Sequence, residues 1–233
     1  MYDFGKLMYL DLNKTGSKFV LSFLNGCLKF KLLEGREHEP VRDAYKPDAF
    51  HIITVRHPYS LYSSLFRYGL EEKGLVFQRL RQAGYLSLYK QENFNEWVAF
   101  VLDSRNSKIL GEGYENLPDN FNIGFLSYRF LRLALIYPHK LIDLYKGFSD
   151  PVAVLLKNSI VDHVLQNENL ETELQDLAIN LKPDFFDQKK VIEFFANSKA
   201  VNASTIKAKS LEEINVLNKK IIQEKEYLLM NLY

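Results

Sequence analysis

The chain has 233 residues, of which 47% are hydrophobic and 25% are charged, enough for a globular domain with a well-buried core. Its formal net charge is only +1, so no overall positive field would draw it to nucleic acid or to an anionic membrane, and any anion site must be local. A single cysteine excludes an internal disulfide and a cysteine-built zinc site, and no apolar run approaches the roughly 20 residues needed to span a bilayer.

The N-terminal sequence MYDFGKLMYLDLNKTG lacks the basic segment and uninterrupted apolar core that are typical of a secretory signal. We therefore expect a cytoplasmic protein. The chain shows no internal repeat, low-complexity tract or linker rich in proline, glycine and serine, so residues 1–233 are expected to form one domain. Cys27 lies in a helical pattern and is expected to be a buried structural thiol.

Two segments are expected to form buried strands, and a third segment is a strand candidate. Residues 6–12 and 50–56 are short, rich in apolar or β-branched side chains, and end at polar breaks. Each is followed by a helical pattern, which favours a parallel sheet with crossover helices. Residues 159–166 are the third strand candidate.

The rest of the chain is expected to be largely helical. Asn93 is a candidate cap for a helix with the apolar positions Phe94, Trp97, Val98 and Val101 on one face. Near the C-terminus, Ser210 and Glu213 form a capping box. The helix that it predicts has apolar positions at helical spacing, namely Leu211, Ile214, Leu217, Ile221 and Ile222.

A polar loop follows the first predicted strand and has the composition of an anion site. Lys14 comes directly after the strand, followed by Thr15, Gly16 and Ser17, and a helix is expected to begin near Lys18. Amides at a helix start carry partial positive charge, Gly16 lets the backbone come close to an anion, and the hydroxyls and Lys14 add donors. The same composition also occurs in ordinary turns, so this loop alone leaves a purely structural role open.

A second polar segment follows the second predicted strand. Arg56 stands at the end of the strand, Pro58 suits the first turn of a helix, and Ser64 lies eight residues beyond Arg56. Because neighbouring parallel strands open into one crevice at their carboxyl ends, Arg56 and Lys14 are expected to face one ligand. Taken singly, Arg56 could equally form a strand-end salt bridge, and Ser64 could be a hydroxyl on a helix surface.

The segments LNKTGS and VRHPYSLYSSLFRYG together resemble the two cofactor motifs of sulfotransferases that use 3′-phosphoadenosine 5′-phosphosulfate (PAPS). The resemblance implies a P-loop-like three-layer α/β/α fold, with a short central parallel sheet and a largely helical remainder, and PAPS as sulfate donor without a metal. It places Lys14, Thr15, Gly16 and Ser17 on the 5′-phosphosulfate. It places Arg56 and Ser64 on the 3′-phosphate.

The resemblance is concentrated in residues 6–69, where both motifs lie, and it departs from the family pattern at two positions. Asn13 stands where the family usually has proline, and Lys18 stands where serine or threonine is common, so Lys18 could contact the sulfonate or point to solvent. Weaker similarity to bacterial, carbohydrate-type members continues in the segments FNEWVAFVL, GFLSYRFLRLAL, IVDHVLQNENLETELQDL and VNAS.

Sulfuryl transfer needs stabilisation of the leaving phosphate oxygen and a base for the acceptor. Lys14 is expected to meet the developing charge and can also serve as a general acid. The base is expected in the loop EGREHEP, where Glu37, His38 and Glu39 are all candidates. His38 is favoured because an unperturbed imidazole, with a pKa of about 6.5, titrates closer to neutral pH than a carboxyl group. A solvated loop with balanced charges is the alternative.

The predicted activity is transfer of a sulfuryl group from PAPS to a hydroxyl of a carbohydrate or another small acceptor, with residues 70–158 as the helical acceptor side. One alternative is a catalytically inactive binding module with the same fold. Another is a nucleotide or nucleoside kinase, which would need a longer glycine-rich loop and an acidic magnesium ligand. The sequence shows no metal-ligand spacing, and it leaves the oligomeric state open, a homo-oligomer included.

Overall fold

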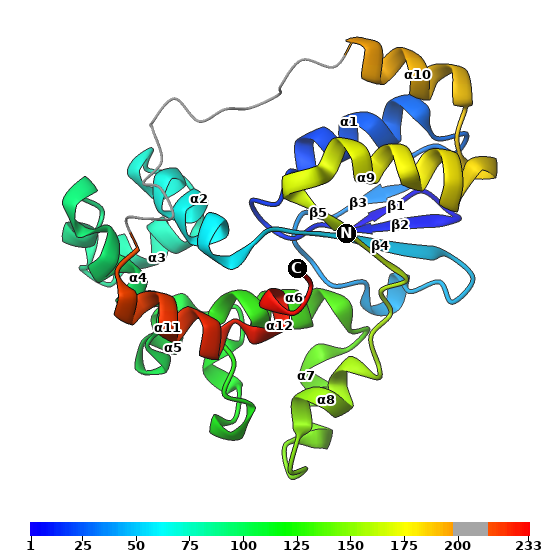
Figure 1. Cartoon of the computed structure of the whole chain (residues 1–233). Helices are drawn as coiled ribbons and strands as arrows, with labels where there is room; N and C mark the ends of the chain where they lie inside the picture. The colour runs from blue at the N-terminus through cyan, green and yellow to red at the C-terminus, as the bar shows by residue number, and fades with distance from the viewer. Residues whose placement is uncertain (198–213) are drawn as a thin grey trace. The chain divides into compact units, whose positions relative to one another are not determined.

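The computed structural model describes residues 1–197 and 214–233, which form a mixed α/β structure of two compact units (Figure 1). The first unit comprises Met1–Arg56, Leu133–Pro138 and Ser159–Ala203, the last described as far as residue 197. The second comprises His57–Arg132, His139–Asn158 and Ser204–Tyr233, the last described from residue 214. That the whole chain acts as one domain stays a prediction.

The first unit is built on a five-stranded sheet with the strand order β3-β1-β2-β4-β5. The strands β2 (Leu7–Leu10), β4 (Phe50–Val55) and β5 (His163–Gln166) are parallel neighbours. Their pairing confirms the three predicted strands, although each is shorter than the sequence suggested. The two-residue strands β1 (Tyr2–Asp3) and β3 (Glu34–Gly35) were not predicted, and they add an antiparallel edge that makes the sheet mixed.

The register brings the carboxyl ends of the three parallel strands to one edge of the sheet. Leu10 pairs with Ile53, and Val55 pairs with Gln166. The loops that follow these strands therefore leave the sheet at the same edge. Lys14 and Arg56 both belong to this edge, as the sequence predicted.

Three helices cover one face of this sheet: α1 (Ser17–Cys27), α9 (Leu170–Asp176) and α10 (Gln188–Asn197) (Figure 1). A π-helical turn, Leu177–Leu181, follows α9. The central parallel strands β2 and β4 are largely apolar and buried, which suits strands that are covered on both faces. The buried cluster between this sheet face and the helices includes Leu7, Tyr9, Val20, Phe23, Leu24, Ile52, Leu165, Leu174, Leu177 and Val191.

The second unit is helical. No strand occurs anywhere between residues 70 and 158, a segment that the structure describes in full. Its helices, of which α6 and α7 run partly into the first unit, are α2 (Pro58–Leu70), α3 (Leu75–Gln82), α4 (Phe94–Leu102), α5 (Ser107–Leu110), α6 (Phe125–Ala134), α7 (Pro138–Tyr145), α8 (Pro151–Leu156), α11 (Val216–Lys225) and α12 (Tyr227–Met230). None of the helices in the described ranges is both long and apolar enough to cross a membrane.

The predicted helix after Asn93 is confirmed as α4, which begins at Phe94. The Asn93 side chain does not cap it, because its amide donates instead to the carbonyl oxygen of Ser87 at 2.9 Å. The apolar face predicted for this helix is buried, at Phe94, Trp97, Val98 and Val101.

The C-terminal helix differs from its prediction. Ser210 and Glu213 of the predicted capping box, with Leu211, lie outside the described residues. The observed helix α11 begins at Val216, and the side chain of Asn215 caps it by accepting from the amide of Asn218 at 2.7 Å. Ile214 and Ile222 are buried, but Leu217 is 67% exposed. The helix begins later than expected, and Leu217 falls in an exposed first turn.

Candidate functional site

The candidate site lies in the first unit, on the loop between β2 and α1. Lys14 (φ 66°) and Gly16 (φ 95°) both adopt the left-handed backbone conformation, and α1 begins at Ser17. The first turn of α1 contains no acidic residue. Amides in a first helical turn lie beyond the reach of intrahelical carbonyls and carry partial positive charge. This loop can therefore present backbone donors and the half-buried Lys14 to an anion.

Gly16 is required here by packing as well as by its backbone. A Cβ atom at this position would lie 2.7 Å from both Asn167 Nδ2 and Leu170 Cδ2. Asn167, directly after β5, also donates its side-chain amide to the carbonyl oxygen of Thr15 at 3.1 Å. The end of β5 thus holds the loop, a contribution that the sequence analysis missed. A role for Gly16 in letting an anion approach stays a prediction.

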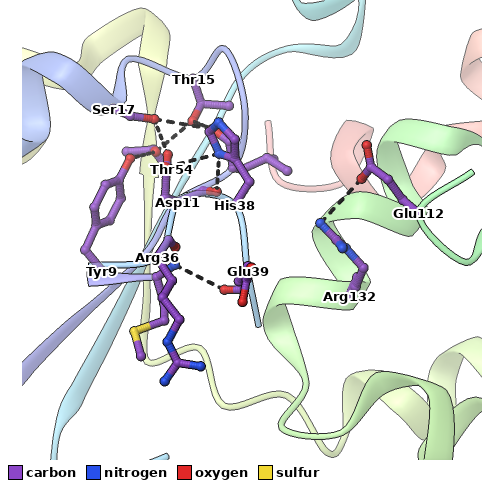
Figure 2. Close-up of polar contacts among 12 residues, drawn as sticks. Tyr9, Asp11, Thr15, Ser17, Arg36, His38, Glu39, Thr54, Glu112 and Arg132 are labelled. Atoms are coloured by element: carbon purple, nitrogen blue, oxygen red, sulfur yellow. Dashed lines mark hydrogen bonds and ion pairs between the residues drawn. The ribbon is translucent and has the colours of Figure 1, made fainter. Parts of the chain in front are cut away.

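The Thr15 hydroxyl points into the protein. It donates to the carbonyl oxygen of Leu12 at 2.7 Å and lies 2.8 Å from the hydroxyl of Thr54, which is 2.7 Å from that of Tyr9 (Figure 2). Because each hydroxyl has one proton, Thr54 donates to Thr15, and Tyr9 donates to Thr54. Burial, with the nearby charge of Asp11, raises the pKa of Tyr9, so this chain of hydroxyls stays neutral. Thr15 can offer a ligand only its backbone.

The Ser17 hydroxyl donates to the carboxylate of Asp11, whose side chain is only 2% exposed. The other oxygen of that carboxylate, Oδ2, lies 3.1 Å from Nδ1 of His38 (Figure 2). The sequence analysis did not single out Asp11. Its one signal was a charged residue between two leucines at the end of an apolar strand segment.

Of the three candidate bases, only His38 is placed beside this loop by a side-chain contact. Its Nδ1 atom also lies 3.1 Å from the carbonyl oxygen of Asp11. Glu37 and Glu39 are exposed. His38 has a left-handed backbone (φ 56°), which is uncommon for a residue other than glycine.

Arg56 connects the second motif to the first. Its Nη1 atom donates to the carbonyl oxygen of Lys14 at 3.4 Å, so two residues 42 positions apart meet at the ends of neighbouring strands. Lys18 is exposed. Ser64 belongs to the second unit, where it is buried about two turns into α2, a helix that begins at Pro58 as the sequence predicted.

Two other reactive side chains in this unit have structural surroundings. Burial is the main cause that lowers the pKa of His51, whose Nδ1 atom is 3.4 Å from Asp162 Oδ2. Burial also raises the pKa of the Cys27 thiol to about 11, which confirms it as a buried thiol. Over residues 1–197 and 214–233, no group of three or more histidine, cysteine, aspartate or glutamate side chains is placed to hold a metal ion.

Comparison of the chain with known protein families, with curated proteins and with solved structures found no significant match.

Proposed function

We propose that this protein is a sulfotransferase that moves a sulfuryl group from PAPS to a hydroxyl of a carbohydrate or another small acceptor. The observation that supports it is the contact between Arg56 and Lys14. These residues belong to two motifs that resemble the two cofactor motifs of the family, and a donor with phosphates at both ends needs both motifs at one site.

The P-loop-like three-layer α/β/α arrangement is part of this proposal, as is a cytoplasmic location. Three parallel strands joined by helical crossovers, with α1 directly after β2, support the fold. Helices cover one face of the sheet. The proposal adds a second layer of helices on the opposite face.

The loop fits an anionic donor in part. Lys14, the amides at the start of α1 and the guanidinium of Arg56 are all suited to phosphate and sulfate oxygens. The hydroxyls of Thr15 and Ser17 are engaged within the protein, so these residues would contribute their amides. A contribution of Ser64, which belongs to the second unit, to the 3′-phosphate site stays a prediction from the sequence motif. Lys18 is an additional cation near the loop.

When bound, the donor supplies an activated sulfuryl group, and its transfer to the acceptor hydroxyl leaves 3′-phosphoadenosine 5′-phosphate and one proton. The side chain of Lys14 can stabilise the negative charge on the departing phosphate oxygen. His38 can accept the acceptor's proton at its ring nitrogen Nε2. Positioning and charge stabilisation dominate transfers of this electronic type, so the site needs few reacting groups.

The first test is binding of 3′-phosphoadenosine 5′-phosphate, measured by calorimetry. We expect Arg56→Ala to weaken binding by roughly ten- to a hundred-fold, since hydrogen bonds to charged groups contribute about 1.5–3 kcal/mol. Arg105→Ala is the control, because Arg105 is 88% exposed and pairs with Asp103, two residues before it. Failure of the wild-type protein to bind this nucleotide would refute the proposal.

The second test is transfer of radiolabelled sulfate from PAPS to panels of glycans, lipids and phenols. We expect Lys14→Ala to abolish transfer while retaining most nucleotide binding, and Arg105→Ala to keep both. Tight nucleotide binding by the wild type without transfer to any panel would identify a binding module instead. Preferential binding of ATP with magnesium would favour the kinase.

A further inference from the structure

We propose that Asp11 is a positioning residue for His38: its buried carboxylate holds the imidazole at Nδ1 and so assigns proton acceptance to Nε2. The proposal rests on the function proposed above, in which His38 takes the acceptor's proton. It adds a residue that the two sequence motifs do not assign to the reaction.

The tautomer follows from the contacts of Nδ1. This atom lies 3.1 Å from Asp11 Oδ2 and 3.1 Å from the carbonyl oxygen of Asp11. Both oxygens can only accept, so Nδ1 must carry the hydrogen. In a neutral imidazole the lone pair is then on Nε2, which is the arrangement required of a base whose other nitrogen is anchored.

The carboxylate itself is fixed. Asp11 is buried, and its second oxygen accepts from the Ser17 hydroxyl at the start of α1. A buried carboxylate with both oxygens engaged has little freedom to rotate, so it can orient the ring that contacts it. It also links the base to Ser17, a residue of the predicted donor loop.

The backbone of His38 is fixed from the other side. The amide of Arg36 donates to the carbonyl oxygen of Met1 at 2.8 Å, and β3 pairs with β1 just before it. A left-handed residue other than glycine persists only where its surroundings hold it, and such residues concentrate at functional sites. The strained backbone of His38 is a second observation, independent of the side-chain contact.

The direct test is an NMR titration of the His38 ring in the full chain. Asp11 contacts the ring, and Glu37 and Glu39 flank it in sequence. Tyr2 of β1 interacts with Asp11 and Glu37, and the N-terminal ammonium group of Met1 donates to the carbonyl oxygens of Arg36 and Glu39. We expect Asp11→Asn to lower the midpoint of the His38 titration by about one pH unit or more, because it removes an opposite charge in contact with the ring. Glu37→Gln and Glu39→Gln each remove a negative charge for which no contact with the ring is seen, so they should shift the His38 midpoint far less.

Asp162→Asn is the matched control, because it breaks an aspartate–histidine pair elsewhere in this unit and should leave the His38 midpoint unchanged. An unchanged His38 midpoint in Asp11→Asn would overturn the proposal. If that variant does not fold, the wild-type titration decides, since a midpoint at or below the unperturbed value of about 6.5 would also overturn it.

Kinetics separate positioning from a structural role. Asp11→Asn should lower kcat by roughly ten-fold or more, within the range that a general base contributes, with little change in KM. In the double variant, adding Asp11→Asn to His38→Gln should cause no further loss of kcat. If the two losses of kcat were independent, Asp11 would act by another route, for instance through Ser17. If the wild type transfers no sulfate but Asp11→Asn still shifts the His38 midpoint as expected, the proposed function is refuted and the Asp11–His38 pairing stands.

Discussion

The side-chain amide of Asn167 donates to the carbonyl oxygen of Thr15 across 152 positions of sequence, and it thereby ties the end of β5 to the loop between β2 and α1. The same amide nitrogen lies where a side chain at Gly16 would have to go. The glycine and the asparagine are therefore two parts of one packed contact.

Gly16→Ala should destabilise the protein by two separable effects. A left-handed conformation costs alanine about 1–2 kcal/mol, and overpacking against Asn167 and Leu170 adds roughly 1–3 kcal/mol. Gly84→Ala is the control, because Gly84 has φ 85° but nothing within 4 Å of the added atom, so only the backbone cost applies. Urea unfolding measures both variants, and equal losses would show that the loop moves aside without cost.

Glu112→Ala should be among the most destabilising substitutions in the second unit. Its carboxylate lies 3.4 Å from Arg132 (Figure 2). It is also paired with Arg129 and lies 3.8 Å from Arg79. The side chains of Glu112 and Arg129 are each only 7% exposed. Removing the carboxylate leaves like charges facing one another, and breaking such a buried pair costs about 3–5 kcal/mol.

The Glu112 carboxylate should stabilise the folded protein more at neutral pH than at acidic pH. Burial acts to raise the pKa of Glu112, but the charge and hydrogen bonds of Arg129, followed by Arg132 and Arg79, lower it overall. The stabilisation is therefore present above the unfolded value of about 4.3 and lost as the pH falls through the folded value. As a control, Arg105→Ala breaks the pair between this 88% exposed side chain and Asp103, and it should cost at most about 1 kcal/mol. Similar losses for Glu112→Ala and Arg105→Ala would contradict the argument.

The outline of the site could be predicted from sequence because it depends on short-range patterns. Apolar strands that end in polar loops place Lys14 and Arg56 at one sheet edge once the strands are known to be parallel. The direction of the Thr15 hydroxyl could not be predicted, since it depends on the left-handed turn at Lys14. Lys14, unlike Gly16, is not a residue type that predicts a left-handed backbone.

Contacts between residues far apart in the sequence could not be predicted either. His38 meets Asp11 across 27 positions, and nothing in the loop EGREHEP indicates which of its ionisable residues turns inward. The antiparallel strands β1 and β3 have two residues each, too few for any periodicity to appear. The partner that orients the candidate base thus emerges only from the folded chain.

Cys27 should be inert in the folded protein. Burial is the main cause that raises its pKa to about 11, and the thiolate is the reactive form. At pH 8 we expect no labelling by iodoacetamide in native buffer and complete labelling in urea. The fraction labelled should follow the unfolding curve measured by circular dichroism, and rapid labelling well below the unfolding midpoint would show that α1 opens locally.

Glu226 should make the stability of the second unit depend on pH in the opposite sense to Glu112. Its fully buried carboxyl group accepts from the Tyr62 hydroxyl at 2.6 Å and from the amides of Ser127 and Leu126 at 2.6 and 3.2 Å. Burial raises the pKa of Glu226, and these hydrogen bonds only partly oppose it. The neutral acid is therefore favoured in the folded state, and its contribution is complete below about 4.3 and lost as the pH rises through the folded value.

Glu226→Gln tests this sign because glutamine keeps the shape without the charge. The free-energy advantage of the wild type over Glu226→Gln, measured by urea unfolding between pH 4 and pH 8, should be largest at the acidic end and shrink as the pH rises. Tyr62→Phe should cost about 1–3 kcal/mol, because it removes the shorter of the two hydrogen bonds to the buried oxygen Oε1 of Glu226. An advantage that grows with pH would mean that the three donors stabilise the carboxylate more than burial penalises it, and the group would then act as an ionised cap for the start of α6.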